Sequence, residues 1–280
     1  MSGSDALLDL LILILVSLIP ALVYLSWVRR AERYQAEAWG GLLRAFVYGA
    51  VVATVVAAIL EVVLVEAGTA FSKAYPAPEF TFLNGNSTAG AFFLVLVIAP
   101  FIEEALKASG VAYFSNLLRG VSDGPVFGAA VGLGFGFFET FLYGLGAYLV
   151  GGLVAGLFLI AIRSVSSVLL HGSSTAMFGY GYARSRFQHE GWASGAYYLL
   201  AVLMHSTFNV LASLGAIVAL FGVSASISDA ASVFALFVAI LFAFEAIEHV
   251  RGVIATNEYP GLAPPPRQRV AVRTRPPGAS

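Results

Sequence analysis

The chain has 280 residues, of which 59% are hydrophobic and 11% are charged. An ordinary soluble domain carries roughly 25% charged residues, so this composition excludes that class and indicates an integral membrane protein. The formal net charge of -1 argues against nucleic acid as a partner, and the absence of cysteine excludes disulfides and thiolate metal sites.

Apolar stretches long enough to cross a bilayer follow one another along the chain. The predicted spans are at about residues 6–28, 43–66, 89–114, 126–150, 153–183, 197–223 and 230–250. The fifth stretch exceeds the length of an ordinary span, so we expect residues 153–162 to form a half-helix or a tilted extension. The fold class is therefore an all-α, polytopic transmembrane helix bundle of about seven spans.

Arginines cluster in alternate connections between these spans, near Arg30, Arg119 and Arg184. The positive-inside rule places those connections in the cytoplasm, with the N-terminus outside and the C-terminus cytoplasmic. Residues 1–258 are predicted to form the bundle, with a catalytic core at about 89–223. Residues 259–280 are rich in proline and arginine, which predicts a disordered cytoplasmic tail lying on anionic lipid.

Glycine is frequent in the fourth span, at positions 128, 132, 134 and 136. Small residues let neighbouring helix backbones approach closely in a membrane, so this helix is expected to be central.

An acidic pair interrupts the third span, where Glu103 and Glu104 are followed one turn later by Lys107. A charge at the centre of a span costs roughly 2.5 to 3.5 kcal/mol on insertion scales. The bundle is therefore expected to bury the pair among polar partners.

Ionisable residues from four spans fall at similar depths: Glu103, Glu139, His171 and His205. Counted from the predicted cytoplasmic ends at 1.5 Å per residue, they lie roughly 14 to 21 Å deep. Such residues inside a membrane protein usually face the bundle interior and mark a functional site. We therefore predict one polar chamber near the middle of the bilayer.

Helical spacing refines this chamber, because residues four apart share a face. The pairs with that spacing are Glu103 with Lys107, Phe135 with Glu139, and His205 with Asn209. Glu104 lies about 100° around the helix from Glu103, which predicts separate roles, with Glu103 as the chemical group and Glu104 as a brace. Arg163 is expected to pair with a carboxylate or with a substrate carbonyl.

Other polar residues of the spans are interpreted as structural. The acids close to predicted span ends are expected to be ordinary surface charges: Asp9, Glu61, Glu66, Glu245 and Glu248. Hydroxyl groups commonly bond to their own helix backbone, so a catalytic serine among Ser164, Ser166 and Ser167 is not expected.

The order of these motifs resembles the PrsW family of intramembrane proteases, over about residues 98–211. Glu103-Glu104-Ala-Leu-Lys107 resembles its EExxK motif, Phe135-Gly-Phe-Phe-Glu139 its FxxxE motif, and His205-Ser-Thr-Phe-Asn209 its HxxxN motif. The segment from Arg163 to His171 is similar to the family's block between the FxxxE and HxxxN motifs. The resemblance implies a peptidase of a prokaryotic plasma membrane that cleaves a membrane-anchored protein, such as an anti-sigma factor.

The mechanism predicted for such a peptidase needs no cofactor. Glu103 takes a proton from the attacking water, Glu104 and Lys107 tune the site, and His205 and Asn209 hold the water or donate to the oxyanion. Glu139 and His171 complete the wall of the chamber. The close rival is a zinc enzyme in which His171, His205 and Glu139 bind the metal.

Two other classes stay open at this point, a proton or cation transporter and a non-enzymatic membrane scaffold. The predicted partners are a single-span membrane protein substrate and the lipid bilayer, without nucleic acid. The sequence predicts no oligomeric state.

Overall fold

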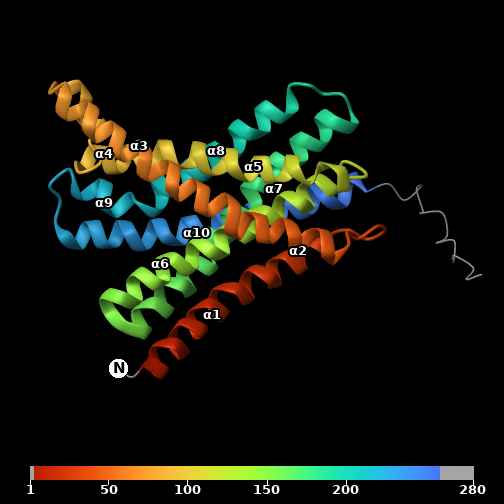
Figure 1. Cartoon of the computed structure of the whole chain (residues 1–280), viewed down its shortest axis with the longest axis horizontal. Coiled ribbons are helices and arrows are strands. Elements are labelled where there is room, and N and C mark those ends of the chain that lie inside the picture. Colours follow the sequence, from red (N-terminus) through yellow and green to blue (C-terminus); the bar gives the residue numbers. More distant parts are fainter. Residues whose placement is uncertain (1–2, 259–280) are drawn as a thin grey trace, which may run out of the picture.

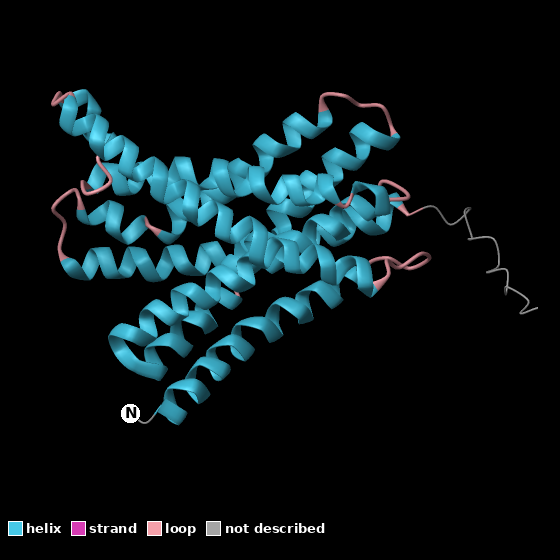
Figure 2. Ribbon diagram, in the orientation of Figure 1, coloured by secondary structure: helices cyan, strands magenta, loops and turns pink. Residues whose placement is uncertain are grey.

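A computed structural model describes residues 3–258, and this part of the chain consists of helices and connecting loops (Figures 1 and 2). The elements in chain order are α1 (Gly3–Arg29), α2 (Trp39–Val47), η1 (Tyr48–Ala53), α3 (Thr54–Ala74), η2 (Pro78–Leu83), α4 (Thr88–Phe93), η3 (Leu94–Ile98), α5 (Ala99–Tyr113), η4 (Ser115–Leu117), α6 (Asp123–Ser164), α7 (Ser167–Phe187), α8 (Ala193–Ala212), α9 (Leu214–Ala219) and α10 (Ala225–Asn257). The predicted polytopic helix bundle is confirmed. The predicted tail, residues 259–280, lies outside the described residues.

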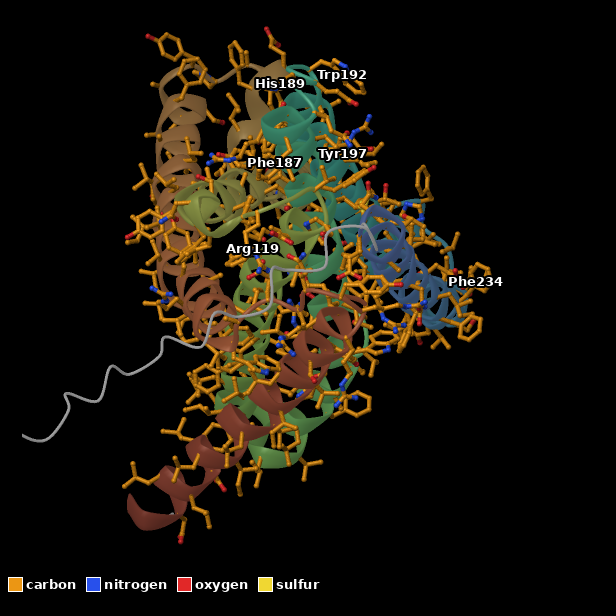
Figure 3. All side chains as sticks on the ribbon, turned by 90° about the vertical axis from the view of Figure 1, so that its right-hand side faces the viewer. Arg119, Phe187, His189, Trp192, Tyr197 and Phe234 are labelled. Atoms are coloured by element: carbon orange, nitrogen blue, oxygen red, sulfur yellow. The ribbon has the colours of Figure 1, made fainter. Side chains whose placement is uncertain are left out.

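The helix connections gather on two sides of the bundle, as expected for a chain that crosses a membrane repeatedly (Figure 1). The α1–α2 and α7–α8 connections and the end of α10 lie on one side, which we call the arginine-rich side. Figure 3 looks onto it and shows Arg119 there. The N-terminus and the α3–α4 and α9–α10 connections lie on the other, the N-terminal side. That the arginine-rich side faces the cytoplasm stays a prediction.

Six stretches of the described chain are long and apolar enough to cross a membrane. One of them, Asp123–Phe187, is 65 residues long and contains α6 and α7. The chain reverses within it at Gly152, whose φ of 76° and ψ of −174° are non-helical and lie in the region open to glycine. This reversal is the turn predicted between the fourth and fifth spans, and the short second arm of α6 is the predicted extension. The count of seven crossings stays a prediction.

The centre of the bundle is α6, which packs against α1, α2, α5 and α7. A Cβ atom at Gly128 would lie 2.4 Å from the carbonyl oxygen of Thr175, and one at Gly132 would lie 2.0 Å from that of His171. The predicted close approach is therefore confirmed, and it fixes α7 against α6 at the level of His171.

Polar and apolar residues are distributed inside out relative to a soluble protein. Large hydrophobic side chains such as Leu11, Val55 and Phe234 are exposed on the helices, while Glu104 and Lys107 are buried. An exposed apolar surface of this extent indicates contact with lipid, and a buried charge requires a partner. The chain is thus a multi-pass membrane protein with a polar interior.

Candidate active site

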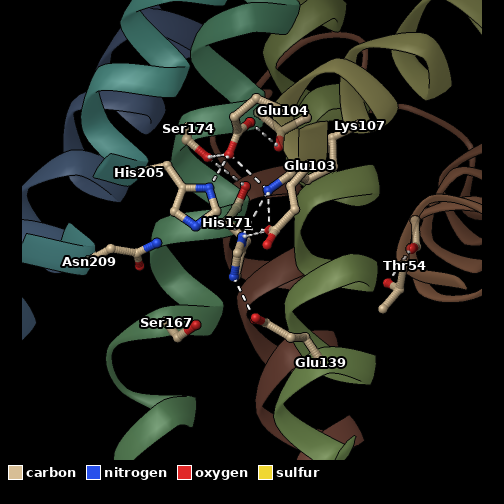
Figure 4. Close-up of polar contacts among 12 residues, drawn as sticks. Thr54, Glu103, Glu104, Lys107, Glu139, Ser167, His171, Ser174, His205 and Asn209 are labelled. Carbon is tan, nitrogen blue, oxygen red and sulfur yellow. Dashed lines mark hydrogen bonds and ion pairs between the residues drawn. The ribbon is translucent and has the colours of Figure 1, made fainter. Parts of the chain in front are cut away.

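Four helices bring the predicted ionisable residues together in one chamber (Figure 4). Glu103 comes from α5, Glu139 from the first arm of α6, His171 from α7 and His205 from α8. Glu103, His171 and His205 are all buried, and a nitrogen of each imidazole lies within 4 Å of Oε2 of Glu103. The predicted chamber is present.

The cation of this chamber is Lys107, which is 0% exposed. Its Nζ lies 2.8 Å from Oε1 of Glu104 and 3.6 Å from Oε2 of Glu103. It also lies 2.9 Å from Nδ1 of His171 and 4.4 Å from the centre of the Phe135 ring. An ammonium group surrounded by carboxylates and an aromatic face is compensated without water.

The hydrogen bonds of the two histidines define which ring nitrogens are free. Lys107 donates to Nδ1 of His171, so the Nε2–H of His171 donates to Oε2 of Glu139 at 2.8 Å. His205 donates from Nδ1 to Oε1 of Glu104 at 3.0 Å. Nε2 of neutral His205 therefore keeps an unshared electron pair.

Glu103 differs from the other carboxylates of the chamber. Its Oε2 is buried and has no hydrogen-bond partner among the described residues. The same atom lies 3.9 Å from Nδ1 of His171 and 3.9 Å from Nε2 of His205. An acceptor without a donor faces a second acceptor, which leaves a place for a water molecule or a cation between them.

Glu104 points away from Glu103, as their angular separation predicts. Its Oε1 accepts hydrogen bonds from Ser174 at 3.0 Å and from His205, and its Oε2 lies 3.4 Å from Oγ1 of Thr175. Glu104 thereby links α5 to α7 and α8 and orients His205.

Glu139 contacts Arg163 as well as His171: Nη2 of Arg163 lies 2.6 Å from Oε2 of Glu139. Arg163 also donates to Oγ of Ser167 at 2.9 Å, and its guanidinium lies 4.0 Å from the centre of the Tyr143 ring. The predicted pairing of Arg163 with a carboxylate is observed. It ties the second arm of α6 to the first across the reversal at Gly152.

A cavity of about 430 Å³ opens from this chamber. It is lined by Thr54, Ala57, Ala58, Glu61, Leu94, Val95, Ala99, Glu103, Phe135, Glu139, Leu142, Tyr143, Arg163, Ser167, His171, His205, Phe208, Asn209, Ala212 and Ser213. From each chamber residue the lining continues along its helix toward the N-terminal side, for example from Glu139 to Tyr143 and from His205 to Ser213. Side-chain exposure rises in the same direction, from 0% at Lys107 to 17% at Glu139.

Asn209 lies in this wall one turn beyond His205. Its Nδ2 donates to the carbonyl oxygen of Val95 at 2.8 Å. Val95 belongs to η3, a π-helical segment, and such segments are often found at functional sites because their wider turn re-aims backbone groups. One Nδ2–H of Asn209 is thus used to hold η3.

Metal-ligating atoms gather within the chamber. Glu103, His171 and His205 each offer one ligand atom within 4.8 Å of the others. Two imidazoles and one carboxylate form a donor set that zinc binds in peptidases, so the residues fit the metal in chemical type. The acid grouped with the two imidazoles is Glu103, whereas Glu139, the carboxylate of the predicted zinc alternative, contacts Nε2 of His171. Lys107 would have to leave Nδ1 of His171 before that atom could bind a metal.

A second group of buried acids lies outside the chamber, on the arginine-rich side. Glu32, Glu37 and Asp123 each have an oxygen within 4.8 Å of the others, and Arg119 contacts Oε1 of Glu37 at 2.7 Å. Burial raises the pKa of Glu32 from 4.5 to about 8, with repulsion from Glu37 and Asp123 adding to it. Burial also raises the pKa of Glu37, aided by repulsion from Asp123. This group closes the bundle between α1, α2 and α6.

Some residues of the site were not predicted from the sequence. Glu61 lines the cavity, so its interpretation as an ordinary surface charge near a span end is wrong. The helix that carries it continues to Ala74, well beyond the predicted end at residue 66, which places Glu61 inside the bundle. Ser174 and Thr175 bind Glu104 one turn after His171, a spacing that could have indicated them.

Comparison with protein-family models assigns most of the chain to a family. Residues 37–244 match the family model described as PrsW family intramembrane metalloprotease. No curated protein and no solved structure matches significantly. The match covers most of the chain and contains every residue of the chamber, which favours a peptidase over a transporter or a scaffold. The chain belongs to the PrsW family and is a membrane-embedded protease.

Proposed function

We propose that this protein hydrolyses a peptide bond of a single-span membrane protein with a water molecule activated by Glu103. The observation that carries the proposal is the unbonded Oε2 of Glu103, which lies 3.9 Å from Nε2 of His205 at the inner end of the cavity. A general base requires a free acceptor within reach of the attacking water, and this atom satisfies that condition.

The water in this scheme lies between Glu103 and His205. Nε2 of His205 accepts a hydrogen bond from one O–H of this water, because Nδ1 is held by Glu104, and that hydrogen stays on the oxygen. Oε2 of Glu103 takes the other proton as the water oxygen bonds to the scissile carbonyl carbon. The carbon–nitrogen bond then breaks, and Glu103 returns the proton to the leaving amine. The products are a carboxylic acid and an amine, and the enzyme is restored.

The negative charge that forms on the carbonyl oxygen needs a donor in the same cavity. The second Nδ2–H of Asn209 is suited to this role, since Val95 fixes the amide in place. Lys107 compensates Glu104 and approaches Glu103 from the buried side, so the cluster keeps its geometry as Glu103 gains and loses a proton.

A metal-dependent reaction is the second candidate, favoured by the grouping of Glu103, His171 and His205. These three residues would hold the ion, and zinc would supply a water molecule of lowered pKa. Glu139 would then orient His171 through the hydrogen bond to Nε2.

The test uses the purified protein in detergent with a panel of single-span membrane protein substrates. Glu103→Gln should lower cleavage by about 10²-fold to 10⁴-fold, while the thermal unfolding temperature stays close to that of the wild type. Glu245→Gln, an exposed acid on α10, is the matched control and should cleave normally. Undiminished cleavage by Glu103→Gln would overturn the proposal.

Chelation separates the two candidates. Full activity after exhaustive treatment with a zinc chelator, in protein whose metal content is substoichiometric, supports water activation by Glu103 alone. Loss of activity that is restored by zinc, with about one zinc per chain, supports the metal-dependent reaction.

A further inference from the structure

Glu61 is the acid of the cavity whose charge nothing in the wall compensates. It lies on α3, and its Oε1 is buried without a hydrogen-bond partner in the part of the chain that the structure describes. Within residues 3–258, no lysine or arginine nitrogen lies within 4 Å of a Glu61 oxygen, which is the limit for an ion pair. An unpaired carboxylate is costly in the interior of a membrane protein, and its presence usually reflects a function.

The two cations near the chamber, Lys107 and Arg163, already have other partners. Lys107 is fully buried against Glu103, Glu104 and His171 and does not line the cavity. Arg163 does line it, but its Nη2 is bound to Glu139 and Ser167, and its plane stacks on Tyr143. Neither cation forms an ion pair with Glu61.

Space is left beside Glu61 on its own helix. Ala57 and Ala58 lie four and three positions earlier on α3, on the same helix face, and both line the cavity. Their short side chains leave room at the carboxylate that a larger residue would fill. A long side chain from outside the protein can therefore reach Glu61 along this face.

We propose that Glu61 is a specificity-determining residue that receives a lysine or arginine side chain of the substrate, close to the scissile bond. The inference rests on the proposed peptidase function, because the same cavity carries Glu103 at its inner end. A basic side chain supplies the missing positive charge and the hydrogen-bond donors. An acidic side chain at that substrate position would face both Glu61 and the paired carboxylate of Glu139, so the cavity selects against it.

The experiment compares single-span substrates that differ at one position near the cleavage site, with lysine, glutamine or glutamate there. The wild-type protein should cleave the lysine substrate with at least 10-fold higher kcat/KM than the glutamine substrate. In Glu61→Gln this ratio should fall to nearly 1, and in Glu61→Lys the glutamate substrate should be preferred. Glu66→Gln is the control, since Glu66 is an exposed acid of α3 outside the cavity, and should keep the wild-type ratio.

Binding in the Glu103→Gln background separates specificity from chemistry. The lysine peptide should bind more tightly than the glutamine peptide there, and adding Glu61→Gln should remove the difference. An unchanged lysine preference in Glu61→Gln, or cleavage by the wild type without any basic preference, would overturn the role of Glu61 and leave the peptidase intact. Failure of the wild type to cleave any substrate would overturn the proposed function and this inference with it.

Discussion

The Nζ of Lys107 lies 2.9 Å from Nδ1 of His171, so a lysine of one helix fixes the tautomer of a histidine on another. The same ammonium group contacts Glu104 at 2.8 Å. A buried carboxylate pair and a buried imidazole thus share one positive charge. Removing that charge is expected to disturb both the stability and the chemistry of the site.

Replacement of Lys107 by methionine should destabilise the protein strongly. Breaking a buried ion pair by removing one partner typically costs about 3 to 5 kcal/mol, because the other charge is left uncompensated. Thermal unfolding in detergent measures the loss. The double variant Glu104→Gln/Lys107→Met should recover part of it, and a double variant as unstable as Lys107→Met would contradict the assigned pairing.

Replacement of Gly132 by alanine should reduce the cleavage rate more than it reduces the fraction of folded protein. The added Cβ would lie 2.0 Å from the carbonyl oxygen of His171, so α7 must shift away from α6. A displacement near 1 Å at a catalytic group costs about 10²-fold in rate. Gly146→Ala on the same helix has no described atom within 4 Å of the new Cβ and is the control. Equal activities of the two variants would argue against this packing constraint.

Replacement of Asn209 by alanine should lower kcat with little change in KM. A single oxyanion donor contributes about 10²-fold to 10³-fold to kcat, because the charge it binds exists only in the transition state. Steady-state kinetics on a cleaved substrate provides the test. Thr207→Ala, at an exposed position of the same helix, should leave both constants unchanged. A rise in KM alone in Asn209→Ala would assign this residue to substrate binding.

Stability should fall as the pH rises toward 8, because of Glu32. Its pKa is raised from 4.5 to about 8 in the folded protein, so folding favours the protonated form. The contribution is fully present below pH 4.5 and is lost as the pH rises through about 8. Glu32→Gln should therefore be more stable than the wild type at pH 8, by at most on the order of 4 kcal/mol. Glu248→Gln, an exposed acid, should follow the wild-type profile; the same profile for Glu32→Gln would contradict the shift.

The sequence predicts the chamber well, because burial in a membrane leaves few explanations for Glu103, Glu139, His171 and His205 at one depth. Helical periodicity also separates Glu103, which lines the cavity, from Glu104, which does not. These inferences rest on local spacing and on the cost of a charge in lipid. Both are properties of the sequence.

Two features depend on how helices pack and are not predicted. The prediction for Glu61 is wrong because the helix that carries it extends to Ala74, which hydropathy alone does not indicate. The position of Lys107 against His171 arises from side chains 64 residues apart in the chain. Pairing between helices leaves no local signal, which is why the sequence does not indicate that Glu103, and not Glu139, is grouped with both imidazoles.

The lining of the cavity extends from Glu103 toward the N-terminal side, so we expect the substrate to reach Glu103 from that side. In the proposed hydrolysis, each turnover consumes one water and creates a new carboxylate and a new amine. We expect the water that is consumed to enter along the same cavity. Cleavage is therefore expected to respond to the pH on the N-terminal side of the membrane rather than to the pH on the arginine-rich side.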